Sequence, residues 1–357
     1  AEAYPGLHLS SEIQGWVFLR DFEQGLRCYK ELQDKTGEDD RWAGVCYFQL
    51  HEDLRAVELF YRAIAREVEG ARINLAHALG YIERGDEVMP ELLRVDQDKL
   101  NTYDRALFFR VKSLHEETGG DLRSALADAE TAWNLIEGQP EELLLATEVL
   151  SQLAVLNGRI GRAKTALNYI ERSLARSTGS DRYRTFVNRA YVQLMLGKTD
   201  NAQKSLESLR REPELPPQLL PITLIYLAEV NWTKGKLGRA LDLYESARLE
   251  ADRFSLGYEE FLAHTGLALL SAYNQEPELS LEHLQAAERL VGDRSDRLAY
   301  RFREIVVMRS LERISGFEVV VELETVADEL GKMGAFQEQA CVLVHIAQAL
   351  WESGSGA

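Results

Sequence analysis

The sequence predicts an all-α fold: a right-handed superhelical α-solenoid of about nine helix-turn-helix repeats, followed by a C-terminal capping helix. Strand-like alternation of Val, Ile and Thr is nearly absent, and only eight prolines occur in 357 residues. Ala, Leu, Glu and Arg recur at helical spacing instead. The chain is also longer than the roughly 250 to 300 residues that one hydrophobic core supports, which favours an elongated stack of small units.

A repeat of constant register runs through the chain. In "LAEVNWTKGKLGRALDLYESA", the small Ala228 is followed seven residues later by Gly235 and five after that by Ala240, and Tyr244 comes four further on. Small residues let helix axes approach to about 8 to 10 Å, and the bulky residue fills the next gap. Glycine closes the turn by accepting a left-handed conformation. The preceding unit matches without gaps at Ala190, Gly197, Ala202 and Leu206.

Each unit has one anchor position in its second helix, so the expected hairpins can be placed in order. The anchors fall at residues 25, 56, 90, 125, 163, 202, 240, 280 and 320, and successive anchors are 31 to 40 residues apart. The turn positions of the earlier units carry Gly85, Gly120 and Gly158, whereas His51 replaces the glycine in the second unit. Pro90 is well placed, because proline is tolerated in the first turn of a helix.

The register predicts a single solenoid domain over residues 1–352, with a tail or linker at 353–357. The repeats are clearest in the middle of the chain and degenerate at both ends. "AFQEQACVLVHIAQALWE" has no second helix after it, so we expect it to cap the array. The expected parts are degenerate repeats over 1–70 and 295–335, well-defined repeats over about 105–290, and the capping helix over about 335–352.

This pattern resembles the tetratricopeptide repeat (TPR) family, whose unit is a pair of antiparallel helices of about 34 residues. The resemblance covers most of the chain. The later units are longer than the family norm, and in this they are similar to the arrays of maltose-regulator-like bacterial transcription activators. The resemblance implies a solenoid whose inner face is lined by the first helices, and partner or effector binding linked to regulation.

The stretch "LMLGKTDNAQ" contains a Gly-Lys-Thr that suggests a phosphate-binding loop. Such a loop requires GxxxxGK[ST] after a strand. The residue five before Gly197 is Val192, and "AYVQLML" belongs to a helical repeat. The equivalent turn of the next unit has Leu237 where Thr199 stands. We therefore interpret these residues as a turn between two helices and expect no nucleotide cofactor.

Composition and motifs argue against several other classes. The net charge of -17 disfavours direct nucleic-acid binding and binding to anionic lipid. Cys28, Cys46 and Cys341 lack the spacing of a zinc site, which favours a reduced, cytoplasmic setting. We find neither a signal peptide nor a run of about 18 uncharged apolar residues, so we expect no membrane span.

The sequence offers no catalytic constellation. It contains no HExxH motif, no GxSxG elbow and no close pair among its seven histidines. Glu260 and His264 are four residues apart, and we interpret them as a surface pair because a third ligand is missing. We therefore predict that the chain is not an enzyme and that it holds no metal and no cofactor.

One segment has an unusual charge. Residues 159–211 hold twelve Arg and Lys against four Asp and Glu, a net of +8, while the remaining residues carry -25. One interpretation is a solvated basic face that balances its acidic neighbours. The alternative is a site for an acidic peptide, a protein or a nucleic-acid backbone.

Counting along the first helices predicts a partner-binding groove. In the TPR family the groove-facing positions lie three and six residues before the small residue, and one and four after it. In the two units described above these positions are Arg184, Val187, Tyr191, Leu194, Ile222, Ile225, Glu229 and Trp232. Arg and aromatic residues are favoured at binding hot spots, although Tyr191 and Trp232 could instead be buried between repeats. Our candidate partner-binding residues are Arg72, Arg110, Arg184, Asn188, Tyr191, Glu229 and Trp232.

These observations predict a non-catalytic scaffold, regulatory in role, that binds a protein or peptide partner in a concave groove between about residues 70 and 275. The alternative is an effector-sensing domain of a larger transcription regulator whose DNA-binding and ATPase domains are absent from these 357 residues.

Overall fold

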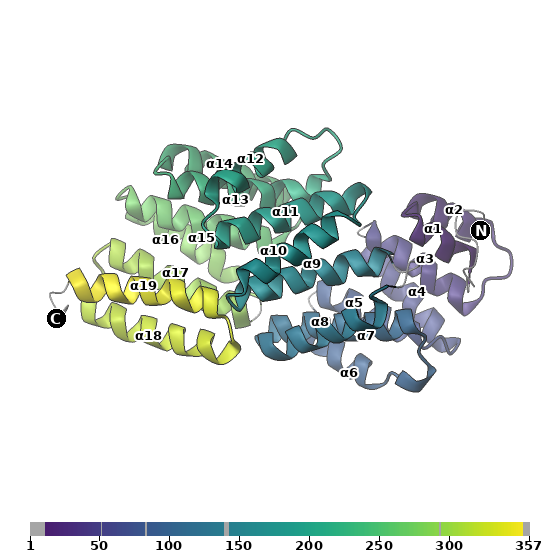
Figure 1. The fold of residues 1–357 in the computed structure, drawn as a ribbon. Helices are drawn as coiled ribbons and strands as arrows, with labels where there is room; N and C mark the ends of the chain where they lie inside the picture. The colour runs from purple at the N-terminus through teal and green to yellow at the C-terminus, as the bar shows by residue number, and fades with distance from the viewer. Residues whose placement is uncertain (1–10, 51, 83, 139–142, 293, 353–357) are drawn as a thin grey trace. The chain divides into compact units, whose positions relative to one another are not determined.

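The computed structural model describes residues 11–50, 52–82, 84–138, 143–292 and 294–352. Within these residues it contains nineteen α-helices and no β-strand. The helices form nine consecutive hairpins, α1/α2 to α17/α18, and the last helix, α19, packs on α18 (Figure 1). The predicted all-α solenoid is confirmed. The predicted tail at 353–357 and His51 lie outside the described residues.

The chain divides into two compact units. Unit 1 comprises Ala1–Glu117 and Ser124–Val149, and unit 2 comprises Thr118–Arg123 and Leu150–Ala357. The proposal of one solenoid domain over 1–352 stays a prediction. The helices that lie wholly or mainly in the first unit are α1 (Glu12–Phe18), α2 (Phe22–Glu31), α3 (Gly37–Gln49), α4 (Asp53–Ala65), α5 (Gly70–Tyr81), α6 (Val88–Leu93), α7 (Thr102–Gly119) and α8 (Leu122–Ile136).

The remaining hairpins lie wholly or mainly in unit 2. Helix α9 (Leu143–Arg159) begins at the end of unit 1 and continues into unit 2. None of the helices that the structure describes combines the length and the apolar character that a bilayer crossing requires. The remaining helices are α10 (Ala163–Leu174), α11 (Gly179–Met195), α12 (Thr199–Leu209), α13 (Leu220–Thr233), α14 (Leu237–Arg253), α15 (Gly257–Tyr273), α16 (Pro277–Arg289), α17 (Arg294–Ser310), α18 (Gly316–Met333) and α19 (Phe336–Glu352).

Local signals in the sequence explain where several helices begin and end. Thr36 and Ser315 each form a capping box with the acidic residue three positions later, and so start α3 and α18. Pro277 occupies the first turn of α16, where its missing N–H costs nothing. Gly334 ends α18 in the left-handed conformation, with φ of 79°.

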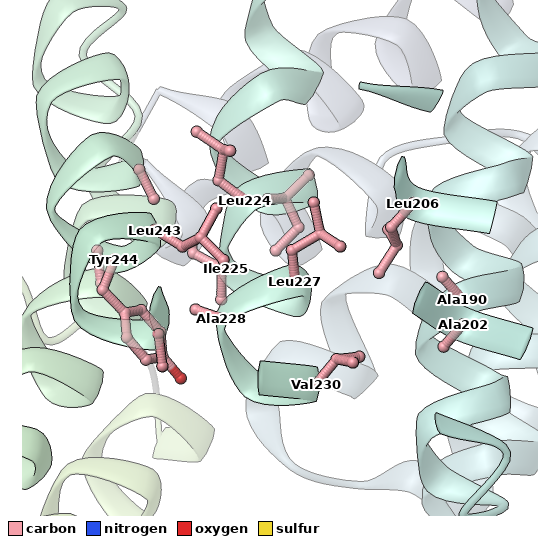
Figure 2. Close-up of a cluster of buried hydrophobic side chains, with 14 of the residues drawn as sticks. Ala190, Ala202, Leu206, Leu224, Ile225, Leu227, Ala228, Val230, Leu243 and Tyr244 are labelled. Atoms are coloured by element: carbon pink, nitrogen blue, oxygen red, sulfur yellow. The ribbon is translucent and has the colours of Figure 1, made fainter. Parts of the chain in front are cut away.

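The small residues of the repeat lie where consecutive hairpins are packed most closely. Figure 2 shows Ala190 of α11, Ala202 of α12 and Ala228 of α13 in one apolar cluster, in which each of them is 0% exposed. Leu206 and Tyr244 fill the spaces between these helices. Burying such a side chain contributes about 1.5 to 3 kcal/mol, so the cluster binds each hairpin to the next.

The turn glycines follow the prediction with two corrections. Gly85 is not left-handed, because it begins a short 3-10 helix, η1 (Gly85–Glu87). Gly197 and Gly235 have φ of 67° and 71°, and each follows the first helix of its hairpin. The Gly-Lys-Thr therefore lies in a turn, and its Thr199 is the first residue of α12. Gly158 is not the left-handed residue of its unit, because it lies inside α9 and Gly161 takes φ of 82° instead.

The close approach of α14 and α15 depends on one glycine. A Cβ atom at Gly266 would lie 2.4 Å from Cζ of the buried Tyr244 ring. We expect Gly266→Ala to lower the free energy of unfolding by about 1 to 3 kcal/mol, because the buried Tyr244 ring or the helices would have to shift to admit the added methyl group. Urea denaturation monitored by circular dichroism measures this loss.

Gly238→Ala is the matched control, since Gly238 lies in the first turn of α14 with no atom within 4 Å of the added Cβ. It should leave stability unchanged or raise it by a few tenths of a kcal/mol. Equal stabilities for the two variants would contradict the packing described for Tyr244.

Candidate functional site

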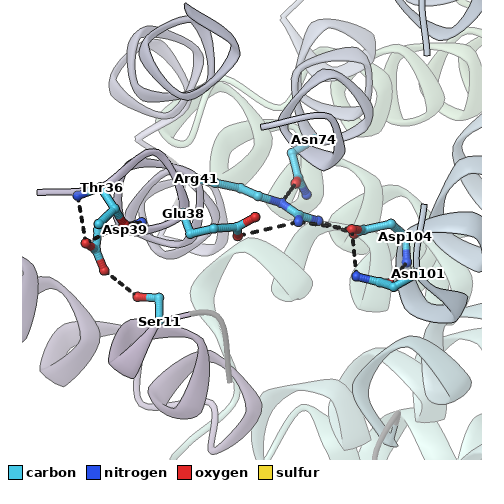
Figure 3. A network of polar contacts seen from close by, with 8 residues as sticks. All are labelled: Ser11, Thr36, Glu38, Asp39, Arg41, Asn74, Asn101 and Asp104. Carbon is cyan, nitrogen blue, oxygen red and sulfur yellow. Dashed lines mark hydrogen bonds and ion pairs between the residues drawn. The ribbon is translucent and has the colours of Figure 1, made fainter. Parts of the chain in front are cut away.

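A buried arginine connects three consecutive first helices of unit 1 (Figure 3). Arg41 of α3 donates from Nε to Oδ1 of Asn74 on α5 over 2.8 Å. Its two terminal nitrogens donate to the carboxylate of Asp104 on α7, one of them over 3.1 Å. Asn101 donates to the same carboxylate and caps α7. Because each polar group in this network is paired within the protein, the network holds the helices in register rather than offering a binding site.

The two sequence-predicted site residues of unit 1 are also engaged in contacts inside it. Arg110 of α7 is 7% exposed, with Nη1 3.3 Å from Nε2 of His77 on α5 and Nη2 3.4 Å from Glu148 at the start of α9. Arg72 is half-buried and pairs with Glu91 of α6 at 3.2 Å. Both cations are thus neutralised by neighbouring helices.

The other five predicted site residues lie in unit 2. Tyr191 of α11 stacks on Tyr226 of α13, with ring centroids 5.6 Å apart and an interplanar angle of 24°. Arg184 is exposed and Asn188 is half-buried, on the same helix as Tyr191. Trp232 packs partly buried against two apolar clusters, so it is a packing residue as well as a site candidate.

Charged groups surround the stacked tyrosines. Burial raises the pKa of Glu229 of α13 above its ordinary value, and Arg303 of α17 lowers it in part. Burial also raises the pKa of Glu259 of α15, which a backbone hydrogen bond and Arg184 lower in part. Burial raises the pKa of Tyr226 well above its usual value, and Tyr258, Tyr191 and Glu229 raise it further.

The last helix contributes to the same surface. Desolvation raises the pKa of Cys341 of α19, and among its charged neighbours Arg303 lowers this pKa while Glu229 raises it. The ring of His345 lies 5.2 Å from that of Phe302 of α17. We call this surface the odd-helix face of unit 2, and define it by Arg184, Tyr191, Tyr226, Glu229, Tyr258, Glu259, Arg303, Cys341 and His345.

Four charges of this face approach no described group of opposite sign closely enough to form an ion pair. Glu229, Glu259, Arg184 and Arg303 make no ion pair within the part of the chain that the structure describes. Only Arg184 and Glu229 were predicted as site residues. Three other residues of the face were missed: Tyr226, Glu259 and Arg303. Tyr226 lies two positions before Ala228, which is not one of the positions counted as groove-facing. Glu259 and Arg303 belong to helices whose groove positions were not counted.

The counting rule also placed three core residues in the groove. Val187, Ile222 and Ile225 were expected to face a partner, but they are 4%, 8% and 1% exposed and belong to the core cluster of α11 to α14. The apolar stripe of a first helix must cover both its own second helix and the next hairpin, and these residues do so.

His264 corrects another expectation. It is buried rather than superficial, and its Nδ1 lies 3.1 Å from Nδ1 of His283 on α16. Glu260 and Glu245 approach the far sides of the two rings at 3.8 and 4.0 Å. No cluster of three or more His, Cys, Asp or Glu suited to a metal ion occurs among the described residues.

Comparison with solved structures identifies the fold class. A Rap protein complexed with competence and sporulation factor superposes with a TM-score of 0.62 at 14% identity, over 97% of this chain and 99% of that one. The apo quorum sensor NprR from B. thuringiensis gives 0.55 at 13% identity, over 95% and 99%. A tetratricopeptide repeat protein from Parabacteroides merdae gives 0.50 at 15% identity, over 78% and 98%.

At these identities the likeness establishes the fold alone. It supports the TPR-like helical-repeat fold expected from the sequence, and it gives no support to the maltose-regulator subtype. No protein-family model matches the sequence, and no curated protein matches it either.

Removing the arginine of the unit 1 network should be costly. Arg41→Met leaves Asp104, which is 5% exposed, without its cationic partner. We expect a loss of about 3 to 5 kcal/mol in the free energy of unfolding, because an uncompensated buried charge is expensive. Arg84→Met breaks an exposed pair with Glu87 and should cause no resolvable loss in the same denaturation assay. Equal effects of the two variants would refute the structural role of Arg41.

The histidine pair should make stability depend on pH. Burial, together with the neighbouring His283, lowers the pKa of His264 to about 4. An unfolded chain protonates this histidine near pH 6.5, so between these values it binds more protons than the folded chain. The stability contributed by neutral His264 is therefore complete above pH 6.5 and declines as the pH falls toward 4.

His264→Gln should reduce this pH dependence, by up to about 3 kcal/mol over the interval. Urea midpoints measured at several pH values for the two proteins report on the His264–His283 pair, since contributions of histidines outside the pair cancel in the difference. Parallel pH profiles would show that His264 is not held neutral.

Proposed function

We propose that the chain recognises a protein or peptide partner without catalysing a reaction, and that the odd-helix face of unit 2 holds this partner. One observation carries the proposal. Glu229 and Glu259 lie near Tyr226, which stacks on Tyr191. Arg303 lies near Glu229 and Arg184 near Glu259, yet none of these four charges forms an ion pair among the described residues.

The energetics support a ligand at this face. A half-buried carboxylate such as Glu229 loses part of its hydration, and this burial raises its pKa. A partner that donates hydrogen bonds to Glu229 and accepts them from Arg303 would recover the lost interactions, each worth about 1.5 to 3 kcal/mol for a charged group. The tyrosine rings add large, rigid contact area at little cost in conformational entropy.

This face calls for a partner of mixed charge with an aromatic or aliphatic side chain between the charges. The acidic partner predicted from segment 159–211 would use additional basic groups there. Arg182, Lys198 and Lys204 are exposed and form no ion pair within the described residues. Arg159 and Arg189 of the same segment, by contrast, pair with Glu338 and Glu171.

A second candidate is an effector-sensing domain, including one of the maltose-regulator type that serves a transcription regulator. Two structural neighbours favour it, since one is a quorum sensor and another was solved with competence and sporulation factor bound. The scaffold and sensor proposals share the odd-helix face. They differ in whether the ligand is a polypeptide or a small effector.

Panning a library of random peptides on the immobilised 357-residue chain tests the proposal. Peptides that are enriched should bind the wild-type chain, and Glu229→Gln with Arg303→Gln should weaken their binding at least about tenfold, as calorimetry can measure. Glu278→Gln with Arg289→Gln, two exposed positions of α16, is the matched control and should bind normally.

Two outcomes would count against the proposal. Enriched peptides that bind both double variants equally would move the site away from the odd-helix face. Failure to enrich any peptide, together with stabilisation of the chain by a small effector, would favour the sensor proposal.

A further inference from the structure

Helix α19 carries an apolar stripe on the side that faces away from α17 and α18. At the start of this stripe the Phe336 ring contacts Arg123 of α8, whose guanidinium carbon lies 5.7 Å from the ring centroid. The buried residues of α19, such as Val342 and Ile346, pack toward α18, while His345 lies beside Phe302 of α17. At 100° per residue, the remaining arc of about 120° contains only apolar side chains. All of them are exposed: Phe336, Ala340, Leu343, Val344, Ala347, Leu350 and Trp351. We call these seven residues the outer arc of α19.

The exposure of this arc is large for apolar side chains. Leu343 is 50% exposed, Val344 is 65% exposed and Trp351 is 77% exposed. Single exposed apolar residues are normal on a protein surface, whereas a continuous stripe marks an interaction site. A terminal repeat that stays in water needs a polar outer face, and α19 lacks one.

The position of α19 in the array explains what kind of surface would cover the arc. Helices α11, α13, α15 and α17 each pack against the second helix of their own hairpin. α19 has the place of a first helix, and no second helix follows it among the described residues. The outer arc is therefore the surface that another α-helix covers in the other hairpins.

The charge distribution permits a second copy of this chain to approach at α19. The chain has a net charge of -17, so most surfaces of two copies repel each other. From Gln339 to Trp351, however, the sequence contains no Asp, Glu, Lys or Arg. Two copies of α19 can therefore approach without placing like charges opposite each other.

The shape of the arc is also self-complementary. Ala340 and Ala347 alternate along it with Leu343 and Leu350, at the heptad spacing of a helix-pairing seam. When two such helices run antiparallel about a two-fold axis near residue 345, each leucine lies opposite an alanine of the other copy. Large side chains then fill the spaces above small ones, and the helix axes can approach closely.

We propose that two copies of this chain associate through an antiparallel pairing of their α19 outer arcs, in which each helix takes the place of the other's second hairpin helix. Trp351 is the anchor at each end of this pairing, because a tryptophan that becomes buried is the residue type that contributes most at interfaces. The proposal is independent of the odd-helix face, since Cys341 and His345 point to the opposite side of α19.

Sedimentation velocity of the 357-residue chain tests the pairing. The wild-type chain should sediment as a dimer that dissociates on dilution. Leu343→Glu with Leu350→Glu should weaken the association at least about thirtyfold and yield a monomer of unchanged helical content. Leu249→Glu is the matched control, because Leu249 is 56% exposed on α14, and this variant should remain dimeric.

Cross-linking tests the register separately. In a Cys341→Ser background, a mixture of Leu343→Cys and Ala347→Cys chains should form a disulfide-linked dimer that neither variant forms alone. A monomeric wild-type chain, a dimer that survives the double glutamate substitution, or equal cross-linking of the separate variants would each overturn the proposal.

Discussion

The requirement that each hairpin bury two apolar faces is the constraint on which the rest of this structure depends. A hairpin such as α13/α14 has core residues toward the hairpin before it and toward the hairpin after it. The fully buried Ala202, Ala228 and Ala240 let the helices come close enough for Leu206 and Tyr244 to fill the gaps. Stability is therefore a sum of contacts between neighbours, and no hairpin inside the array is stable alone.

Polar side chains can fix how far packed helices are shifted along each other. The two units differ in how their polar side chains are paired. In unit 1, Arg41 reaches Asn74 on α5 and the carboxylate of Asp104 on α7. Arg110 lies between His77 on α5 and the carboxylate of Glu148 on α9. In unit 2, burial raises the pKa of Glu229 of α13 and Arg303 of α17 lowers it in part, although the two side chains form no ion pair. A buried pair fixes one arrangement of helices, whereas unpaired charges can serve a ligand. This contrast is the reason for placing the recognition surface in unit 2.

The sequence predicted the fold well because the repeat register is a local property. Ala228, Gly235 and Ala240 describe one hairpin through spacing alone, and the structure places them in the first helix, the turn and the second helix. The candidate site was harder to predict. Arg110 was expected in a groove, but Glu148, 38 residues away, and His77 neutralise it on either side. His264 was expected at the surface, yet the α15/α16 pairing brings His283 to it.

Both errors share a physical cause. Counting from a small residue predicts in which direction each side chain of one helix points. The partner that a polar side chain meets there depends on the positions of two or three helices together. Tyr226 illustrates this, since nothing in its own repeat distinguishes it from a core residue until Tyr191 is placed against it.

The final helix shows how the same constraint generates surfaces for different purposes. One side of α19 packs on α18, a second side carries Cys341 and His345 toward the odd-helix face, and the third is the apolar outer arc. Because the second and third sides diverge around the helix, a second copy on the outer arc leaves the odd-helix face accessible. A ligand on the odd-helix face would nevertheless contact the same helix that pairs with the second copy. If each contact stabilises α19, ligand binding and association of the two copies would strengthen each other.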